Sequence, residues 1–247
     1  GLKLENHTYT DWVAQPDVRL AWRARESMLL WTAVSRAIRS PTPFDRDVEE
    51  RIGGQLILAG NRAFEPEALT AWEFGYRGRP WPALSVEATL FVHDYEDLRT
   101  IESGGAVPLT WKNGLAGQTY GVQAWARWEL TSWWRVSPGV TLLRKRLAFD
   151  DGAQRLVGTT QAGNDPSGHG TLTSSMDLGD RLDFDATLRH VGRLEAPAFD
   201  AYTELSARLG WRAAPGLDLA LVGQNLLHEH HQEYPAPQGQ GIGRSVL

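Results

Sequence analysis

The chain has 247 residues, of which 42% are hydrophobic and 10% aromatic, so it can bury a sizeable core and its composition does not indicate disorder. It has no cysteine, which excludes disulfides and thiolate chemistry, and its net charge of -5 comes without a basic cluster, which argues against a nucleic-acid partner. No apolar run approaches the roughly 18 residues of a helical membrane span, so any part that crosses a membrane must be built from strands.

Apolar and polar residues alternate with a period of two along most of the chain, which is typical of strands with one dry and one wet face. The clearest case is the stretch 64–98, which predicts a hairpin closed by the short GRPWPA turn. In chain order, the predicted strands are residues 2–7, 17–23, 28–39, 68–76, 84–93, 120–129, 134–142, 171–178, 182–189, 202–212 and 217–227, and the last residues of the chain look like the start of a twelfth.

The connections between these strands alternate between two classes of length. Those near Arg25, Pro80, Ser132, Gly179 and Ala214 have about two to six residues, whereas those near Asp11, Glu49, Gly105, Asp151, Pro197 and Gln232 mostly have about seven to twenty-five. The longest, residues 40–64, is expected to lack secondary structure. Short turns on one side and long loops on the other are typical of outer-membrane barrels, and a soluble sandwich has no reason to sort its loops by side. The sequence therefore favours a membrane barrel with a wet lumen.

Three segments resemble the TonB-dependent outer-membrane receptor family. They are WTAVSRAIRSPTPFDRDV at 31–48, FEPEALTAWEFGYR at 64–77 and VGQNLLHEHHQEY at 222–234, which look like the family's Ser-Arg-rich strand end, its Pro-Glu and Glu-x-Gly strand, and its Asn-Leu penultimate strand. The resemblance covers essentially the whole chain. It implies an all-β fold, an antiparallel up-and-down meander of about 12 strands that forms part of a transmembrane β-barrel of about 22 strands.

The family's plug domain, its TonB box and its N-terminal strands have no counterpart in the sequence. We therefore expect residues 1–247 to be the C-terminal portion of such a barrel, a fragment whose sheet is open. The resemblance implies a receptor in the outer membrane of a Gram-negative bacterium, with lipid around it and the TonB complex reached through the absent plug.

The resemblance also implies energised uptake of a scarce nutrient. A ferric siderophore is the first expectation, on the frequency of that class in the family, and haem or cobalamin are alternatives. Two competing hypotheses are a passive porin-like or adhesin barrel and a soluble β-rich carbohydrate-binding module. No phosphate loop, HExxH or G-x-S-x-G motif is present, so no enzymatic activity and no cofactor are expected.

Candidate ligand-binding residues lie around the third strand and the loop after it. Arg36 and Arg39 could bind an anionic ferric chelate by charge-assisted hydrogen bonds, although Arg36 shares a face with Leu30 and could instead reach lipid head groups. Asp45 and Asp47 could attract a cationic or metal-bearing substrate, or they could simply be solvated.

A second cluster contains His228, His230 and His231. Imidazoles beside carboxylates could bind Zn, Cu or Ni. A solvated polar loop is the simpler interpretation, because loose loops rarely hold ligand geometry. We therefore predict no metal site and keep the three histidines as weak candidates.

Overall fold

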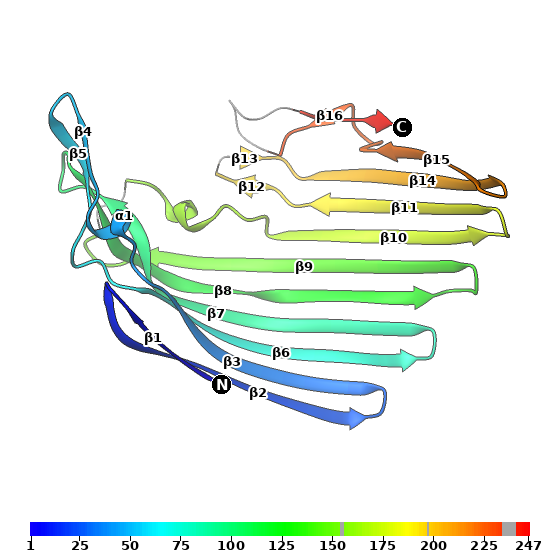
Figure 1. Cartoon of the computed structure of the whole chain (residues 1–247), viewed down its shortest axis with the longest axis horizontal. Coiled ribbons are helices and arrows are strands. Elements are labelled where there is room, and N and C mark those ends of the chain that lie inside the picture. Colours follow the sequence, from blue (N-terminus) through cyan, green and yellow to red (C-terminus); the bar gives the residue numbers. More distant parts are fainter. Residues whose placement is uncertain (154–155, 197, 234–240) are drawn as a thin grey trace.

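Residues 1–153, 156–196, 198–233 and 241–247 are described by a computed structural model of the chain. One long curved sheet makes up most of it (Figure 1). Its strands, in spatial order, are β1 (Leu2–His7), β2 (Thr10–Arg25), β3 (Met28–Arg39), β6 (Glu67–Trp81), β7 (Leu84–Glu102), β8 (Leu109–Glu129), β9 (Trp134–Phe149), β10 (Gly168–Leu178), β11 (Leu182–Val191), β14 (Tyr202–Ala214), β15 (Leu217–Gln224) and β18 (Ser245–Val246).

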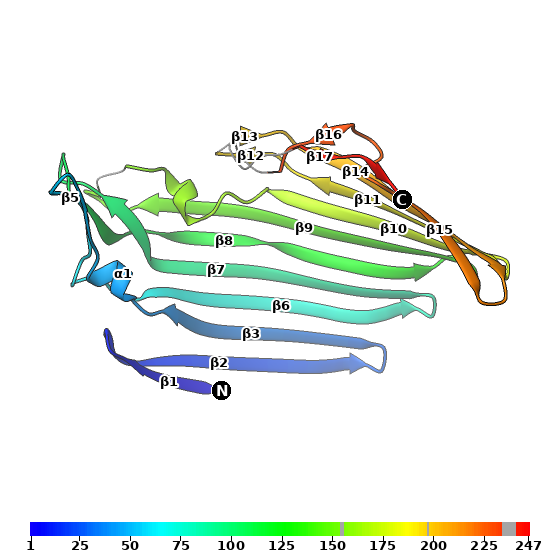
Figure 2. The same ribbon diagram turned by 45° about the horizontal axis from the view of Figure 1, so that its top comes forward.

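The sheet is an antiparallel meander in which each strand of this path pairs with the next. All eleven predicted strands are present, and β18 is the predicted start of a twelfth. Within the described residues no pairing joins β1 to the other edge, and Figures 1 and 2 show the two chain ends at opposite edges of the sheet. The all-β, open meander predicted from the sequence is thus confirmed.

The two faces of the sheet differ in the way that the alternation predicts. In the β11–β14 pair, Leu188 lies opposite Leu205 on the apolar face and Thr187 lies opposite Ser206 on the polar face. Large side chains stay uncovered on the apolar face, where Leu142 is 51% exposed. Such a surface is stable only against lipid or another apolar partner.

Tryptophans cluster on the apolar face near the short turns. Trp22, Trp128 and Trp211 lie within a few residues of those turns and stay exposed. An amphipathic ring of this kind suits a membrane interface.

On the opposite face, Gly75 permits a close approach that a larger residue would block. A Cβ at Gly75 would lie 2.0 Å from the indole of Trp31, so the absence of a side chain on β6 lets the ring from β3 lie across it. This glycine belongs to the Glu-x-Gly pattern noted in the sequence.

The two ends of the sheet confirm the predicted sorting of turns for most links. The turns at 26–27, 82–83, 130–133, 179–181 and 215–216 lie at one end, on the right in Figure 1, and the longer connections lie at the other. The links expected near Pro197 and Gln232 include residues outside the described parts, namely 197 and 234–240. Tyr234 of the third family-like segment is among them.

Three predicted loops are wrong. The loop expected around Asp11 is a turn at 8–9, because β2 starts at Thr10 and pairs with β1 as far as Pro16. Residues 40–64 are not structureless, since they contain α1 (Pro43–Arg46), β4 (Glu49–Ile52) and β5 (Gln55–Ala59). The loop between β7 and β8 shrinks to 103–108, because both strands continue well past the predicted ends.

One physical reason explains why β7 and β8 extend past the ends that the sequence predicted. A strand that crosses a membrane needs only about 9–11 residues, whereas β7 and β8 have 19 and 21. At the long-loop end their two faces are no longer sorted into apolar and polar, and the period of two fades. The hairpin β4–β5 then packs on this extension, with β5 pairing in parallel with Leu109 and Thr110 of β8.

The largest fully buried side chains lie at this long-loop end, in the 40–66 segment and in the parts of β7 and β8 next to it. Phe64 is 2% exposed and Leu115 is 0% exposed, and both belong to the 40–66 segment or the β8 extension that it covers. No helix in the described part of the chain is long and apolar enough to cross a membrane.

Candidate functional site

Helix α1 begins the segment between β3 and β6, and its sequence explains why it forms there. The hydroxyl of Thr42 accepts a hydrogen bond from the backbone N–H of Asp45 at 3.3 Å, and the Asp45 carboxylate accepts one from the backbone N–H of Thr42 at 2.9 Å. Pro43 suits the first helical position, where its missing N–H would have had no partner in the helix. This reciprocal cap fixes the position of the Asp45 carboxylate.

The carboxylate of Asp45 is the centre of an ion-pair network that joins four elements. It is fully buried and accepts from Nη1 of Arg39 at 3.1 Å and from Nη1 of Arg99 at 3.0 Å. Arg39 also pairs with Glu67, and the second carboxylate oxygen of Glu67 accepts from the backbone N–H of Arg99 at 2.6 Å. We call Arg39, Asp45, Glu67 and Arg99 the loop network. It ties α1 to β3, β6 and β7.

The loop network also sets the charge of Asp45. Burial raises the pKa of its carboxyl, but hydrogen bonds from the N–H and hydroxyl of Thr42 and from Arg99 and Arg39 outweigh burial and lower the pKa to about 2. Asp45 is therefore ionised at neutral pH, and two guanidinium groups already compensate its charge.

Asp47 has a different partner, the turn between β1 and β2. Its carboxylate accepts from the hydroxyl of Tyr9 at 2.9 Å, and this hydrogen bond raises the pKa of the Tyr9 phenol. Arg46 lies 5.2 Å from the centre of the Tyr9 ring and donates to its carbonyl oxygen at 3.0 Å. Asp47 and Arg46 therefore fasten the 40–66 segment to the edge of the sheet.

Below the loop network, the polar face encloses a hollow of about 540 Å³, which we call the upper chamber. Phe91, His93 and Tyr95 follow one another along β7, with the His93 ring centre 5.0 Å from that of Phe91 and 6.4 Å from that of Tyr95. Lys145 of β9 lies across from them and pairs with Asp165 at 2.6 Å. The other lining residues are Arg39, Glu67, Leu98, Arg99, Thr119, Gln123, Thr141, Leu143, Leu147 and Ala162.

Arg39 has an unsatisfied donor in this region. Its Nη2 is buried and has no hydrogen-bond partner in the described part of the chain, although its other nitrogens bind Asp45 and Glu67. A buried guanidinium N–H without an acceptor is costly. Together with the aromatic row, it makes the upper chamber a place where an anionic aromatic group could bind.

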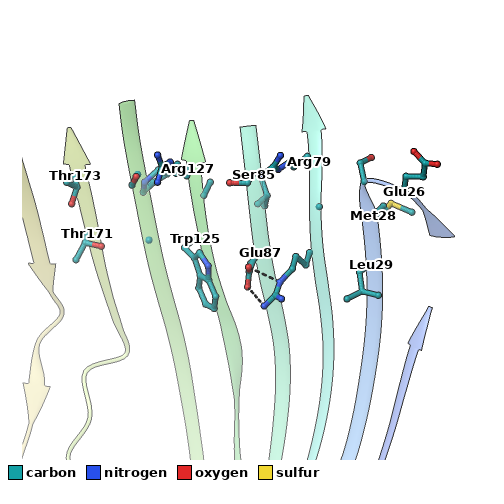
Figure 3. A pocket seen from close by; sticks show the side chains of 18 of the residues that line it. Glu26, Met28, Leu29, Arg79, Ser85, Glu87, Trp125, Arg127, Thr171 and Thr173 are labelled. Carbon is teal, nitrogen blue, oxygen red and sulfur yellow. Dashed lines mark hydrogen bonds and ion pairs between the residues drawn. The ribbon is translucent and has the colours of Figure 1, made fainter. Parts of the chain in front are cut away.

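A second, larger hollow of about 940 Å³ lies on the same face near the short turns, and we call it the lower chamber. Figure 3 shows Glu87 paired within it, and the partner is Arg77 at 2.8 Å. Arg79 and Arg127 reach in from neighbouring strands, with Trp125 below them (Figure 3). Its charged residues are four arginines (Arg23, Arg77, Arg79 and Arg127) and two glutamates (Glu26 and Glu87), so the lining carries a net positive charge, which suits contact with an acidic surface.

Arg36 faces away from both chambers. It donates to the hydroxyl of Thr70 at 3.4 Å and pairs with Glu96 at 3.4 Å, on the face that carries Val34 and Leu30. The structure thus separates Arg36 from Arg39, which the sequence had grouped. Ligand contact by Arg36 and by Arg39 stays a prediction, and so does the alternative that Arg36 reaches lipid head groups.

The three histidines do not come together. His228 and His231 both approach Oε1 of Glu204, with their Nδ1 atoms at 2.6 and 3.3 Å, and Nε2 of His231 lies 3.0 Å from Glu233. His230 lies in the two-residue strand β16 (His230–His231), which pairs with β17 (Ile242–Gly243), and its side chain is exposed. No group of three or more His, Cys, Asp or Glu side chains in the described ranges could hold a metal ion.

The Glu233 carboxylate is also engaged by other residues. Burial raises its pKa, but hydrogen bonds from Tyr202, His231 and Arg189 outweigh burial and lower it to about 2. The cluster therefore fastens the segment after β15 to β11 and β14.

The sequence missed several residues that the structure brings to the upper chamber. Glu67 lies directly opposite Arg39 in the β3–β6 register, so a correct strand alignment would have found that pair. Strand alignment could not have found Arg99, because this residue follows the predicted end of its strand. Lys145 lay beyond the predicted end of β9 for the same reason.

A sequence model of the family "TonB dependent receptor-like, beta-barrel" matches residues 1–226. A search of curated proteins found no match. Among solved structures, a variant of the ferric enterobactin receptor of Pseudomonas aeruginosa is similar, with a TM-score of 0.74 and 16% identity, and the match covers 99% of this chain and 41% of that one.

Two further structures resemble the chain. The siderophore receptor PirA of Acinetobacter baumannii has a TM-score of 0.75 and 14% identity, again over 99% of this chain and 41% of its own. The FrpB iron transporter of Neisseria meningitidis has a TM-score of 0.73 and 15% identity, over 96% and 38%. The chain therefore spans about two fifths of the length of these structures, and at such identities the likeness concerns the fold.

Proposed function

Because the chain belongs to the TonB-dependent receptor β-barrel family, we propose that residues 1–247 form the C-terminal portion of the barrel of an outer-membrane receptor that imports a ferric siderophore with energy from the TonB complex. The observation that carries the proposal is the arrangement of the inner wall. A chamber lined by cationic and aromatic groups lies beneath folded loops at one end, and a larger chamber with a net positive charge lies at the other.

The membrane location is supported by the outer face of the sheet. Leucines, valines and tryptophans remain exposed along β2 to β15, on the side away from the chambers. A soluble carbohydrate-binding module would have to cover such a face, and the described part of the chain has no element on it.

The larger receptor is supported by the open edges of the sheet. In the described residues, β1 at one edge and the β15–β18 side at the other leave backbone N–H and C=O groups without strand partners, which lipid does not tolerate. Further strands have to complete the wall, in agreement with the 41% coverage of the similar structures. The basic lower chamber would then face the plug through which the receptor reaches TonB.

The ligand class is supported by the upper chamber and by the relatives. Several similar structures are siderophore receptors, and one is the Pseudomonas aeruginosa receptor in complex with enterobactin. For this chain the matching features are Nη2 of Arg39, which has no hydrogen-bond partner in the described residues, and the row Phe91, His93 and Tyr95. An anionic ferric catecholate offers acceptors for the first and aromatic faces for the second.

The test uses the full-length receptor in cells that depend on it for iron. Uptake of a labelled ferric catecholate should occur, should stop when TonB is deleted, and should fall when His93 is changed to Ala. The matched control is Val92→Ala on the same strand, whose side chain faces outward and should leave uptake unchanged. Uptake that does not need TonB would support a passive barrel, and unchanged uptake in His93→Ala would exclude the upper chamber as the binding site.

A further inference from the structure

Two arginines on the outer wall have no role in the function proposed above. Arg144 and Arg146 lie on β9 on the same face as Val140 and Leu142, and all four side chains are exposed. Two residues apart on one face, the two arginines are about 7 Å from each other along the strand. On the outer face of β9, the two positive charges therefore follow directly after the apolar residues Val140 and Leu142.

The position of the two arginines relative to the apolar band can be estimated from the neighbouring strand β8. Arg144 lies opposite Tyr120 of β8, and Trp128 marks the other end of the same outer face. At about 3.3 Å per residue, Tyr120 and Trp128 are about 26 Å apart along the strand, or about 20 Å across the membrane after the tilt of barrel strands. The apolar band of such barrels is about 25 Å tall, so with Trp128 at one boundary, Tyr120 and Arg144 stand within about 5 Å of the other, on the long-loop side.

Among the described residues the two arginines have no carboxylate partner, in contrast to other charged residues at this end. Arg36 pairs with Glu96, Lys145 with Asp165 and Arg189 with Glu233. In the described part of the chain Arg144 and Arg146 form no ion pair. Arg144 reaches only the carbonyl of Leu143 at 3.5 Å, and Arg146 lies 5.3 Å from the centre of the Tyr120 ring.

Beside the two arginines the edge of the sheet has a gap, which we call the notch, because β10 is shorter than β9. β10 begins at Gly168, opposite Leu142, so β9 continues beyond that point paired only with β8 (Figure 1). A hollow of about 380 Å³ lies in the notch, between β9 and the segment that contains the 3-10 helix η1 (Thr159–Ala162). Besides the Lys145–Asp165 pair and Glu195, its polar lining includes Arg144, Arg146, Arg193, Thr159, Thr160 and Ser167.

We propose that Arg144, Arg146 and Arg193 bind the phosphate groups of a phosphorylated lipid in the membrane leaflet on the long-loop side. Guanidinium groups bind phosphate oxygens through paired, charge-assisted hydrogen bonds, and the hydroxyls of the notch can donate further ones. The acyl chains of such a lipid would lie along the apolar stripe below Arg144. The inference rests on the membrane location proposed above.

The test measures lipid retention by the full-length receptor purified in detergent, using native mass spectrometry. The probes are a synthetic diglucosamine lipid with two phosphates, the same lipid without phosphate, and inorganic phosphate alone. We expect the unaltered receptor to retain the phosphorylated lipid and the double variant R144Q/R146Q to retain it about tenfold less, whereas R144K/R146K, which keeps both charges, should lose much less.

The matched control is Arg36→Gln, an outer-wall arginine that already has a carboxylate partner, and it should change retention by less than about twofold. Equal retention of the lipid with and without phosphate, or an equal loss in Arg36→Gln, would overturn the proposal. Displacement of the lipid by inorganic phosphate would make the notch a free-anion site and would also overturn it. A heat-dependent shift in electrophoretic mobility shows that each variant is a folded barrel, so failure of the lipid site is distinguishable from failure of the membrane assignment.

Discussion

Asp45 shows that an aspartate in a charged loop can stabilise the loop and need not bind a ligand. An exposed aspartate in a charged loop could attract a cation, but the reciprocal cap with Thr42 carries this one into the interior, where Arg39 and Arg99 meet it. A buried carboxylate that is this well paired has little field left for a substrate. Its measurable role is the order of the 40–66 segment above the upper chamber.

Replacing Asp45 by Ala should loosen that segment. The two guanidiniums lose their shared acceptor and the N–H of Thr42 loses its partner in the reciprocal cap, so we expect the free energy of local opening to fall by about 1.5–3 kcal/mol. Hydrogen exchange of residues 40–66 in the full-length receptor measures it. Glu50→Ala on the exposed strand β4 is the control and should change the opening energy by less than about 0.5 kcal/mol. Equal effects of the two substitutions would contradict the role given to Asp45.

The same network predicts a dependence on pH. The folded-state pKa of Asp45, about 2, lies below its ordinary value of about 3.9. The stability that it contributes is therefore fully present above about pH 4 and is lost as the pH falls through about 2. Cleavage by pepsin within 40–66 should rise between about pH 4 and pH 2. In Asp45→Asn this rise should be absent, and an identical profile in both proteins would rule out Asp45 as its cause.

At the scale of the strand, prediction succeeded where lipid and water impose opposite demands on the two faces. The alternation in residues 182–189 and 202–212 placed Leu188 and Leu205 on one side and Thr187 and Ser206 on the other, and the register confirms both pairs. Beyond the membrane no such demand exists. There Leu115 and Thr100 are both fully buried on neighbouring strand extensions, and no pattern of two marks them.

The candidate site also contains some residues that could be predicted from the sequence and some that could not. Arg39 and Asp45 are six residues apart and were both named from the sequence, whereas Glu67 and Arg99 reach them only through strand pairing and a strand extension. Contacts over such separations depend on the register of β3, β6 and β7. A single sequence gives that register only where the hairpin turns fix it.

The facing of the strands can be tested by arginine substitution in the full-length receptor. Arginine at Leu188 or Leu205 should cost about 2–4 kcal/mol, because these side chains face lipid near the middle of their strands, whereas arginine at Thr187 or Ser206 should cost little. Unfolding in denaturant with reconstituted receptor measures the difference. Equal costs for the two pairs would contradict the assignment of the outer face.

The sidedness of the connections can be tested with inserted epitope tags. A tag at Gly105 or Gly163, both in connections at the long-loop end, should be reached by antibody on intact cells. A tag at Gly179, in the turn between β10 and β11, should be reached only after the outer membrane is opened. Labelling at Gly179 on intact cells would reverse the topology.

At the scale of the whole molecule, the sheet has two free edges and a hollow polar face. β1 and β18 lie at opposite sides of the curve shown in Figures 1 and 2, and nothing in the described residues pairs them. The sequence predicted this openness from the number of strands alone, since about twelve cannot close at the width of the family's barrels. What it could not predict is the folded assembly of α1, β4 and β5 over the upper chamber.

The most direct test of the account is expression of residues 1–247 alone, fused to an export signal, beside the full-length receptor. Unpaired edge strands are tolerated neither by lipid nor in a dry interface. We therefore expect the isolated segment to aggregate or be degraded, while the full-length protein gives a protease-resistant band in the outer membrane whose mobility shifts on heating. A monomeric, protease-resistant and heat-modifiable species formed by residues 1–247 alone would show that these strands close by themselves and would contradict the account.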